Sequence, residues 1–284
     1  MNPNEVTSIC IIRLSSMGDI LLITPLLRQL RNQFPHARID MAVAKRFAEI
    51  IRYFRKQKLE LVKLKKGFGK PIIPIAERYR STANALKVQD DKKGLELWLP
   101  EEKDLGFYPP EKRINITNPP KLLAIAPGAR HFTKRWLPER FAETALLFNE
   151  QFNTQIVLLG GTDDREICNE VRRQIPFPIT DATGSTSIYD TTRALDLTDG
   201  LICNDSGIMH LAAARHVPVA AIFGSTVREF GFAPYRVANT IIEKELDCRP
   251  CTHIGRDECP LGHFKCMNLI SPEEVVNQYL SIKN

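Results

Sequence analysis

The sequence lacks the features of several large protein classes. No apolar run in its 284 residues approaches the roughly 18 to 20 residues that a membrane-spanning helix needs. Its beginning, MNPNEVTSIC, lacks the basic and apolar regions of a secretory signal. Neither sign of charge dominates: 39 Lys and Arg against 33 Asp and Glu give a net charge of +6, short of the basic footprint of a nucleic-acid-binding protein. We therefore expect a soluble, cytoplasmic protein with no nucleic-acid partner.

Motifs of common nucleotide enzymes are also missing. No G-x-G-x-x-G sequence follows a strand, and the chain has no Walker A sequence, no H-E-x-x-H pair and no G-x-S-x-G elbow. Dinucleotide-dependent oxidoreductases and P-loop kinases therefore lose their main support.

The seven cysteines are an odd number in a chain without a secretory signal, which argues against a disulfide framework. Four of them form the series Cys248-x2-Cys251-x7-Cys259-x6-Cys266. This series has enough soft ligands for a structural zinc ion, while free thiols and redox-dependent pairing are the alternatives. Four thiolates would close the coordination shell, so a catalytic zinc is not expected.

The first half of the chain predicts a parallel α/β arrangement. A short β-branched run over 9–14 predicts a strand, which ends in the turn SSMGD over 15–19. The leucine-rich stretch after it predicts a helix, with Pro25 in its first turn or at a kink. Residues 39–43 predict a second strand, and the strand-helix-strand order implies a parallel sheet.

The second half predicts repeated βα winding, which is typical of nucleotide-binding sheets. Expected strands cover 122–126, 156–159, 201–203 and 219–223, and expected helices cover 138–152, 163–175, 187–196, 206–215 and 272–282. Within the first half, a strongly basic segment over 52–70 suits contact with an anionic membrane surface, or is a solvated helix face or loop. Pro119-Pro120 predicts the linker.

Small and polar residues follow the expected strands, at the edge where open parallel sheets bind ligands. These positions hold Gly18-Asp19 and the stretches 127–129, 160–162, 204–207 and 224–226. Glycines let a ligand approach the backbone, and exposed N–H groups at helix starts attract phosphate. Each glycine alone also suits an ordinary tight turn, but five such places in one chain favour a site.

One loop carries three permanent cations, Arg130, Lys134 and Arg135, directly after an expected strand. They suit a diphosphate whose charge grows as it leaves, and a solvated basic loop is the alternative. Asp205 suits either an N-cap carboxylate or a group that holds ligand hydroxyls, and both roles are compatible. His210 is expected to be a packed or capping histidine.

Taken together, these segments resemble glycosyltransferase family nine, the bacterial heptosyltransferases that build the lipopolysaccharide inner core. The resemblance is carried by IIRLSSMGDILLITPLLRQLRNQFP, PGARHFTKRW, LLGGTDD, CNDSGIMHLAAARHVPVAAIFGST and CRPCTHIGRDECPLGHFKCM, in that order. It covers residues 8–50 and 120–280.

The resemblance implies a GT-B architecture in which two Rossmann-like domains face a cleft. The shortened acceptor-side domain would span 1–118, the nucleotide-sugar domain 119–270, and a helix over 271–284 would return to the first domain. The implied reaction is an inverting, metal-independent transfer of heptose from ADP-L-glycero-D-manno-heptose to an inner-core sugar hydroxyl. The implied partners are the ADP-sugar and a lipid-linked saccharide, and no cofactor is required.

Matched residue by residue, the resemblance makes Asp19 the catalytic base, which accepts the proton of the acceptor hydroxyl; helix capping is the alternative role. Donor-binding positions are Lys134, Asp205, Ser206, Gly207, Thr226, Gly128, Arg130 and Gly161, with the glycines permitting close approach. Acceptor-binding residues are not identified.

Two departures from the family pattern bear on activity. The region between 50 and 80 is several tens of residues shorter than usual, and Trp136-Leu137-Pro138 has one residue more than the usual Trp-Pro. Donor binding should survive both changes. A noncatalytic or degenerate nucleotide-sugar-binding protein is therefore the alternative function, and a zinc-dependent interaction module on a sugar-binding core is a third.

Overall fold

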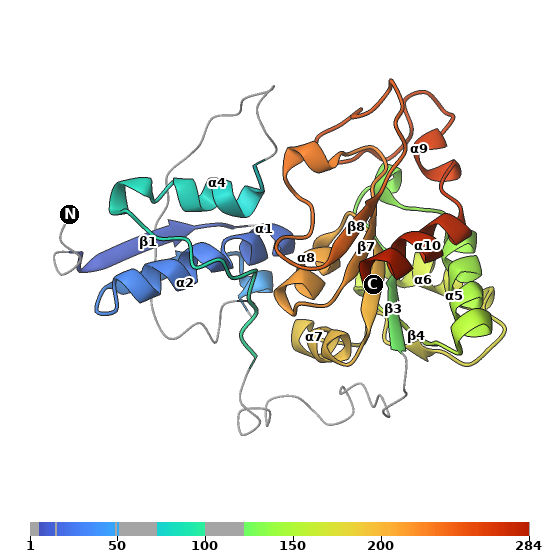
Figure 1. Cartoon of the computed structure of the whole chain (residues 1–284), viewed down its shortest axis with the longest axis horizontal. Helices are drawn as coiled ribbons and strands as arrows, with labels where there is room; N and C mark the ends of the chain where they lie inside the picture. Colours follow the sequence, from blue (N-terminus) through green and yellow to red (C-terminus); the bar gives the residue numbers. More distant parts are fainter. Residues whose placement is uncertain (1–5, 15, 49, 51–72, 100–121, 284) are drawn as a thin grey trace.

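The computed structural model describes residues 6–14, 16–48, 50, 73–99 and 122–283, which form two α/β halves lying side by side (Figure 1). In the first half, β1 (Ser8–Ile12) and β2 (Arg38–Ala42) form a parallel two-stranded sheet. Their register runs from Ser8 opposite Arg38 to Ile12 opposite Ala42. The predicted parallel order of this half is confirmed.

Two helices rather than one connect these strands: α1 (Met17–Leu22) and α2 (Thr24–Gln33). The helix is interrupted at Ile23, because Pro25 has no N–H to donate and is tolerated only in the first turn of a helix. Beyond β2, the described residues of this half form η2 (Lys45–Phe47), α4 (Ile75–Ser81) and η3 (Asn84–Leu86). Residues 87–97 follow in an irregular conformation, without helix or strand.

The second half contains a six-stranded parallel sheet with the strand order β5-β4-β3-β6-β7-β8. Its strands are β3 (Leu122–Ala126), β4 (Gln155–Leu158), β5 (Thr180–Asp181), β6 (Gly200–Asn204), β7 (Val219–Ile222) and β8 (Asn239–Ile242). The chain therefore moves outward from β3 in one direction and from β6 in the other. This reversal creates a topological switch point between β3 and β6, the place where such sheets bind ligands.

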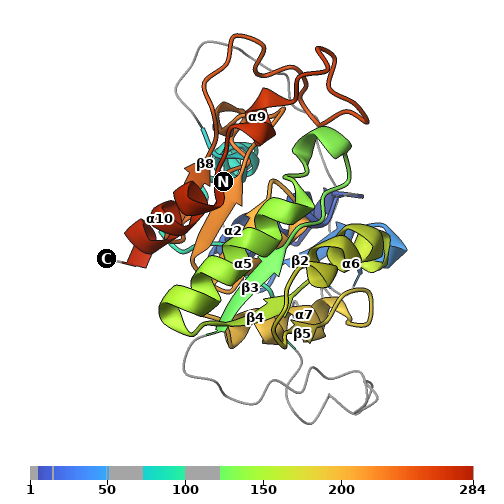
Figure 2. The same cartoon turned by 90° about the vertical axis from the view of Figure 1, so that its right-hand side faces the viewer.

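Helices cover both faces of this sheet (Figure 2). They are α5 (Pro138–Phe152), α6 (Arg165–Arg173), α7 (Ile188–Asp196), α8 (Gly207–Ala214), α9 (Lys265–Asn268) and α10 (Pro272–Lys283). Alternate residues of each strand point to opposite faces: Leu123 and Ile125 join a core with α5, α6 and α10, whereas Ala124 and Ala126 join a core with α7 and α8.

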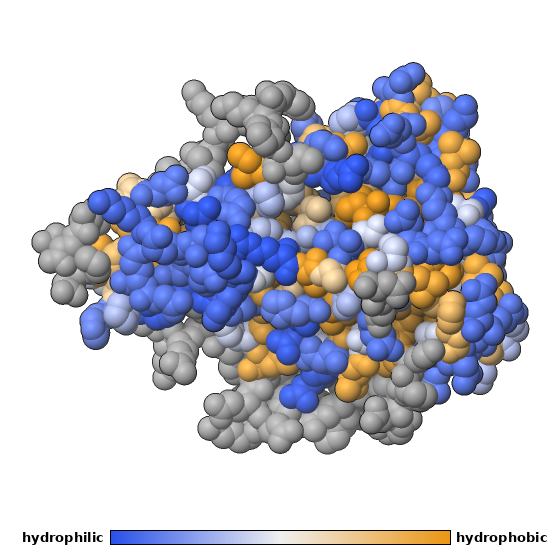
Figure 3. Space-filling view, viewed as in Figure 1, coloured by the Kyte–Doolittle hydropathy of each residue, from blue (hydrophilic) through white to orange (hydrophobic). Residues whose placement is uncertain are grey.

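The core on the α8 side extends into the first half. It contains Ile20, Leu21 and Leu22 of α1, together with Leu95 and Leu97 of the irregular segment. The first half has only a small core of its own, around Ile11, Leu26 and Leu27. The outer surface over α2 is largely hydrophilic, in agreement with the apolar faces of the first half being turned inward (Figure 3).

The last helix differs from the expectation that it would return to the first half. Instead, Val275, Val276 and Tyr279 are buried in the core of the six-stranded sheet, against α5. The Tyr279 hydroxyl donates to the Asp199 carbonyl oxygen at 3.0 Å, and Gly200 leaves room for the ring, because a Cβ there would lie 2.1 Å from that hydroxyl. The six-stranded sheet thus offers this helix an apolar surface and a hydrogen-bond partner.

Two other expectations lie outside the described residues: the basic segment over 52–70 and the linker at Pro119-Pro120. Within the part of the chain that the structure describes, no helix combines the length and apolar character needed to cross a membrane.

Candidate active site

Three of the predicted donor-binding residues meet at the switch point of the large sheet. Lys134 ends η6 (Phe132–Lys134) after β3, Asp205 follows β6, and Thr226 follows β7. The Lys134 Nζ lies 2.6 Å from Asp205 Oδ2, and the Thr226 hydroxyl donates to the same oxygen at 2.7 Å. The side chains of Lys134 and Asp205 are only 15% and 9% exposed, so this ion pair is shielded from solvent.

A buried amide holds the two loops of the switch point together. The Asn204 Nδ2 donates to the Pro127 carbonyl oxygen at 2.7 Å, and its Oδ1 accepts from the Trp136 N–H at 3.0 Å. Asn204 therefore fixes both ends of the loop that carries Lys134. Sequence reasoning missed this role, although the position of Asn204 at the end of a buried strand was a usable indication.

The start of α8 lies beside the ion pair. Ser206 is the N-cap residue, in extended conformation, and its Oγ is buried without a hydrogen-bond partner among the described residues. Gly207 lies close to α1, since a Cβ there would be 2.6 Å from Met17 Cε. Free N–H groups and the helix dipole make this end of α8 suited to an anion.

Gly128 and Gly161 surround a carboxylate that sequence reasoning missed. A Cβ on Gly128 would lie 2.2 Å from Asp164 Cγ, and the Gly161 N–H donates to Asp164 Oδ2 at 2.8 Å. Burial raises the pKa of the Asp164 carboxyl, while the bond from Gly161 opposes that rise. The sequence shows two adjacent aspartates here and does not indicate which one turns inward.

The three expected cations of the β3 loop have different surroundings. Lys134 forms the ion pair with Asp205 at the switch point. Arg135 folds back on its own loop and donates from Nε to the Ala129 carbonyl oxygen at 2.6 Å, and Arg130 is exposed. The Arg135 guanidinium thus binds backbone carbonyl oxygens of its own loop.

Asp19 lies in the first turn of α1, where four donors surround its carboxylate. Oδ2 accepts from the Ser16 N–H at 3.0 Å and from the Ser16 hydroxyl at 3.2 Å. Oδ1 accepts from the Tyr79 hydroxyl at 3.1 Å and forms an ion pair with Arg13. The capping role proposed as the alternative for Asp19 is thus present, and it holds the carboxylate in a fixed orientation.

His210 connects this carboxylate to the switch point. It is 4% exposed, and a Cβ on Gly18 would lie 2.6 Å from its Cδ2, so the ring packs directly against the turn before Asp19. Burial lowers the pKa of His210 to about 4, against the opposing effect of the Asp205 and Asp19 carboxylates, and the Lys134 cation adds to the lowering. A neutral imidazole therefore lies within electrostatic reach of both carboxylates, and its Nδ1 has no partner among the described residues.

A family model for glycosyltransferase family 9 (heptosyltransferase) matches residues 29–261. The chain belongs to glycosyltransferase family 9. Lipooligosaccharide heptosyltransferase 2 of Campylobacter jejuni is 33% identical over 169 residues, which are 57% of this chain and 51% of that protein. The match thus spans about half the length of this curated relative.

Two solved structures share the fold over nearly the full length. The family 9 glycosyl transferase of Veillonella parvula gives a TM-score of 0.78 at 21% identity and covers 98% of this chain and 97% of its own. The ADP-heptose lps heptosyltransferase II of E. coli gives a TM-score of 0.71 at 17% identity, with 97% and 98% covered. These likenesses confirm the predicted α/β fold with its parallel sheet, of the GT-B type.

In this family 9 chain, the segment that contains the four cysteines (residues 248–266) is hydrogen-bonded to the loop that carries Lys134. The Arg256 N–H donates to the Thr133 hydroxyl at 2.8 Å, and the Thr133 N–H donates to the Arg256 carbonyl oxygen at 3.0 Å. Cys248, Cys251, Cys259 and Cys266 are all free thiols. Across the described residues, no group of three or more His, Cys, Asp or Glu side chains is arranged to hold a metal ion, so the expectation of a structural zinc gains no support.

Proposed function

We propose that this chain is an inverting heptosyltransferase that moves a heptose from an ADP-heptose donor to a sugar hydroxyl of the lipopolysaccharide inner core. The observation that carries the proposal is the approach of Asp19, from one half, to the Lys134–Asp205 pair, from the other, around one buried neutral histidine. Membership of family 9 supports the reaction class. The names of the E. coli and Campylobacter jejuni relatives support the donor and the acceptor class.

In this proposal the reaction is a single displacement at the anomeric carbon. Asp19 accepts the proton of the acceptor hydroxyl as its oxygen forms the new bond to that carbon, while the bond to the ADP oxygen breaks on the opposite face. The configuration therefore inverts. Lys134 and the free N–H groups at the start of α8 balance the charge that grows on the departing diphosphate, so the proposal requires no metal ion.

Donor and acceptor would divide between the two halves. We propose that residues 119–270 bind the ADP-sugar, with Asp205 and Thr226 at its sugar or ribose and Gly128 and Gly161 permitting close approach. Residues 1–118 would present the lipid-linked acceptor saccharide at the cytoplasmic face of the membrane. The basic segment over 52–70 would supply the membrane contact, and it lies outside the described residues.

The test replaces the proposed base with its neutral isostere. Asp19→Asn should lower kcat about 100- to 10,000-fold, because no carboxylate remains to take the proton. Its affinity for ADP should match that of the unaltered protein. ADP release is measured from ADP-L-glycero-D-manno-heptose with a Kdo-containing inner-core acceptor, in a buffer with EDTA, and ADP binding is measured by calorimetry.

Asp40→Asn is the matched control, since Asp40 is also an aspartate of the first half paired to an arginine, Arg38, at 2.8 Å. It should retain full turnover. Normal turnover by the Asp19 variant would remove the proposed base. ADP binding without any turnover by the unaltered protein would favour the noncatalytic nucleotide-sugar-binding function.

A further inference from the structure

Helix α4 contacts the carboxylate of Asp19 through one tyrosine. The Tyr79 hydroxyl donates to Asp19 Oδ1 at 3.1 Å, and the Arg13 guanidinium, which pairs with the same carboxylate, lies 5.6 Å from the centre of the Tyr79 ring. Oδ2 is bound by Ser16, from the same helical turn as Asp19. Among the described residues, Arg13 and Tyr79 are the ones that bind Asp19 from outside its own turn, and Tyr79 comes from α4.

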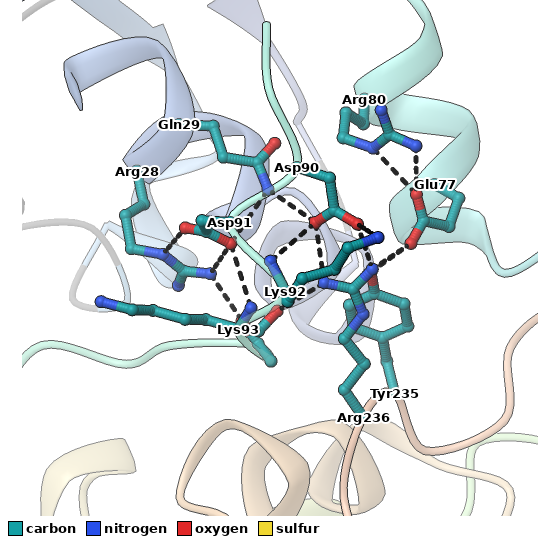
Figure 4. Close-up of polar contacts among 11 residues, drawn as sticks. Arg28, Gln29, Glu77, Arg80, Asp90, Asp91, Lys92, Lys93, Tyr235 and Arg236 are labelled. Atoms are coloured by element: carbon teal, nitrogen blue, oxygen red, sulfur yellow. Dashed lines mark hydrogen bonds and ion pairs between the residues drawn. The ribbon is translucent and has the colours of Figure 1, made fainter. Parts of the chain in front are cut away.

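The same helix is bound by the second half of the molecule two residues earlier. Arg236 donates from Nη2 to Glu77 Oε1 at 2.7 Å, and the Tyr235 hydroxyl donates to the same oxygen (Figure 4). Arg236 also binds both oxygens of Asp90, at 2.8 and 2.7 Å. The hydrogen bonds from Arg236 hold the pKa of the Asp90 carboxyl below its ordinary value, against burial. Burial raises the pKa of the Glu77 carboxyl, but the bonds from Tyr235 and Arg80 and the Arg236 charge bring it below its ordinary value, so this ion-pair cluster persists at neutral pH.

A backbone contact fixes the start of α4 as well. The Ile75 N–H donates to the Gly231 carbonyl oxygen at 2.9 Å. Gly231 has φ +87°, and a Cβ there would lie 2.5 Å from the Ile73 carbonyl oxygen, so only glycine allows this approach. The segment over 226–236 thus begins at Thr226, which binds Asp205, and ends at Arg236, which binds α4.

We propose that Tyr79 is a positioning residue for Asp19, and that the segment over 226–236 of the nucleotide-side half sets the place of Tyr79 through α4. The inference rests on the proposed function, in which Asp19 is the base. Ser16 binds Oδ2 within the same turn, while Tyr79 and Arg13 bind Oδ1, and this two-sided hold fixes the plane of the carboxylate. A base in fixed orientation meets the acceptor hydroxyl without first rotating into place.

The first test removes only the hydroxyl. Tyr79→Phe should lower kcat about 10- to 100-fold through misplacement of the base, with the KM for the ADP-sugar unchanged. Among the described residues beyond its own turn, Asp19 is faced by the Arg13 cation, which follows β1, by the neutral Tyr79 phenol of α4 and by the neutral His210 of α8. A fall in kcat with an unchanged KM for the ADP-sugar distinguishes misplacement of the base from a loss of the donor site.

Tyr279→Phe is the matched control, since the Tyr279 hydroxyl also donates a hydrogen bond, to the Asp199 carbonyl oxygen, and lies far from Asp19 on α10. It should leave kcat unchanged. A Tyr79 variant with normal kcat would overturn the positioning role, even if its thermal stability were lower.

The second test breaks the contact between the halves. Arg236→Met should lower kcat about 10-fold with ADP affinity retained, whereas Arg228→Met should not, because Arg228 lies in the same segment but pairs with Glu243 of its own half, at 3.0 Å. The double variant with Tyr79→Phe should be no slower than Tyr79→Phe alone, within about twofold, because both changes act through one contact. Fully multiplicative effects would overturn the connection through α4.

A third measurement needs no turnover and separates failure of this inference from failure of the proposed function. Tyr79 is replaced by 3-fluorotyrosine, whose phenol ionises at lower pH, and is titrated by fluorine NMR. Burial and the Asp19 charge raise the pKa of Tyr79, with Arg13 opposing, so its titration should move to lower pH in Asp19→Asn and in Arg236→Met but not in Arg228→Met. An unmoved titration in the first two variants would overturn the inference, whatever the reaction proves to be.

Discussion

The imidazole of His210 is a neutral group among charged ones. In the unfolded chain it protonates near pH 6.5, whereas the folded site keeps it neutral to about pH 4. Between these pH values the unfolded state binds more protons than the folded state, so the folded state loses stability as the pH falls. The stability is fully present above about pH 6.5.

We predict that this one residue lowers the free energy of unfolding by about 2.4 kcal/mol between pH 7 and pH 4.5. Urea denaturation at both pH values measures the loss. His210→Gln should lack this part of the pH dependence, and His36→Gln, at an exposed position, should retain it. An equal loss in all three proteins would assign the acid sensitivity to other groups.

Single residues of the site differ in whether their place could be predicted from the sequence. Lys134, Asp205 and Thr226 follow strands, and the rule that parallel strands present their carboxyl ends at one edge predicted that they would meet. Tyr79 reaches Asp19 across 60 residues of sequence. No local pattern encodes such a contact, because it depends on where α4 packs.

At the scale of elements, the contact between α1 and α8 brings the proposed base, Asp19, close to the proposed donor site. Two glycines permit it, but their surroundings differ. A Cβ on Gly18 would meet the ring of His210, which is buried and has no space to move. A Cβ on Gly207 would meet Met17 Cε, the end of a flexible side chain.

We therefore predict that Gly18→Ala lowers the free energy of unfolding by about 1–3 kcal/mol, as overpacking against a rigid neighbour does. Gly207→Ala should cost less, since Met17 can turn away and alanine favours a helix over glycine. Guanidinium denaturation of both variants gives the comparison. Equal losses in the free energy of unfolding would contradict the difference expected between the two contacts.

Element prediction succeeded where apolar residues formed an unbroken run or a periodic pattern over several helical turns. The helix over 138–152 and the strand over 122–126 have the predicted bounds. The seven-residue helix α4 and the two-residue strand β5 were not predicted, because they are too short for periodicity to distinguish them from loops. The last helix was predicted, but not its place, because an apolar face does not say which apolar surface it covers.

At the scale of the molecule, one hydrophobic core crosses from the large sheet into the first half. Leu95 and Leu97 of the first half are fully or almost fully buried, at 0% and 2% exposure, in the same cluster as α8 and β6. On the other side of that segment, Arg28 of α2 binds Asp91 at 2.6 Å and Glu96 at 2.9 Å. The segment over 91–97 is therefore bound by both halves at once.

We predict a single cooperative thermal transition, with the calorimetric enthalpy equal to the van't Hoff enthalpy. Leu97→Ala should lower the free energy of unfolding by about 2–5 kcal/mol and shift this transition without splitting it. Differential scanning calorimetry of both proteins provides the measurement. Two resolved transitions would mean that the halves fold as independent domains.

The shared core also sets a condition on recombining this protein with its relatives. A chimaera that exchanged only residues 1–118 would place foreign side chains where Ile20, Leu21 and Leu22 now fill the space beside α8. The first half is therefore not exchangeable by itself in this chain. A functional hybrid would have to exchange α8 and the facing strand residues together with the first half, so that the two sides of the shared core remain complementary.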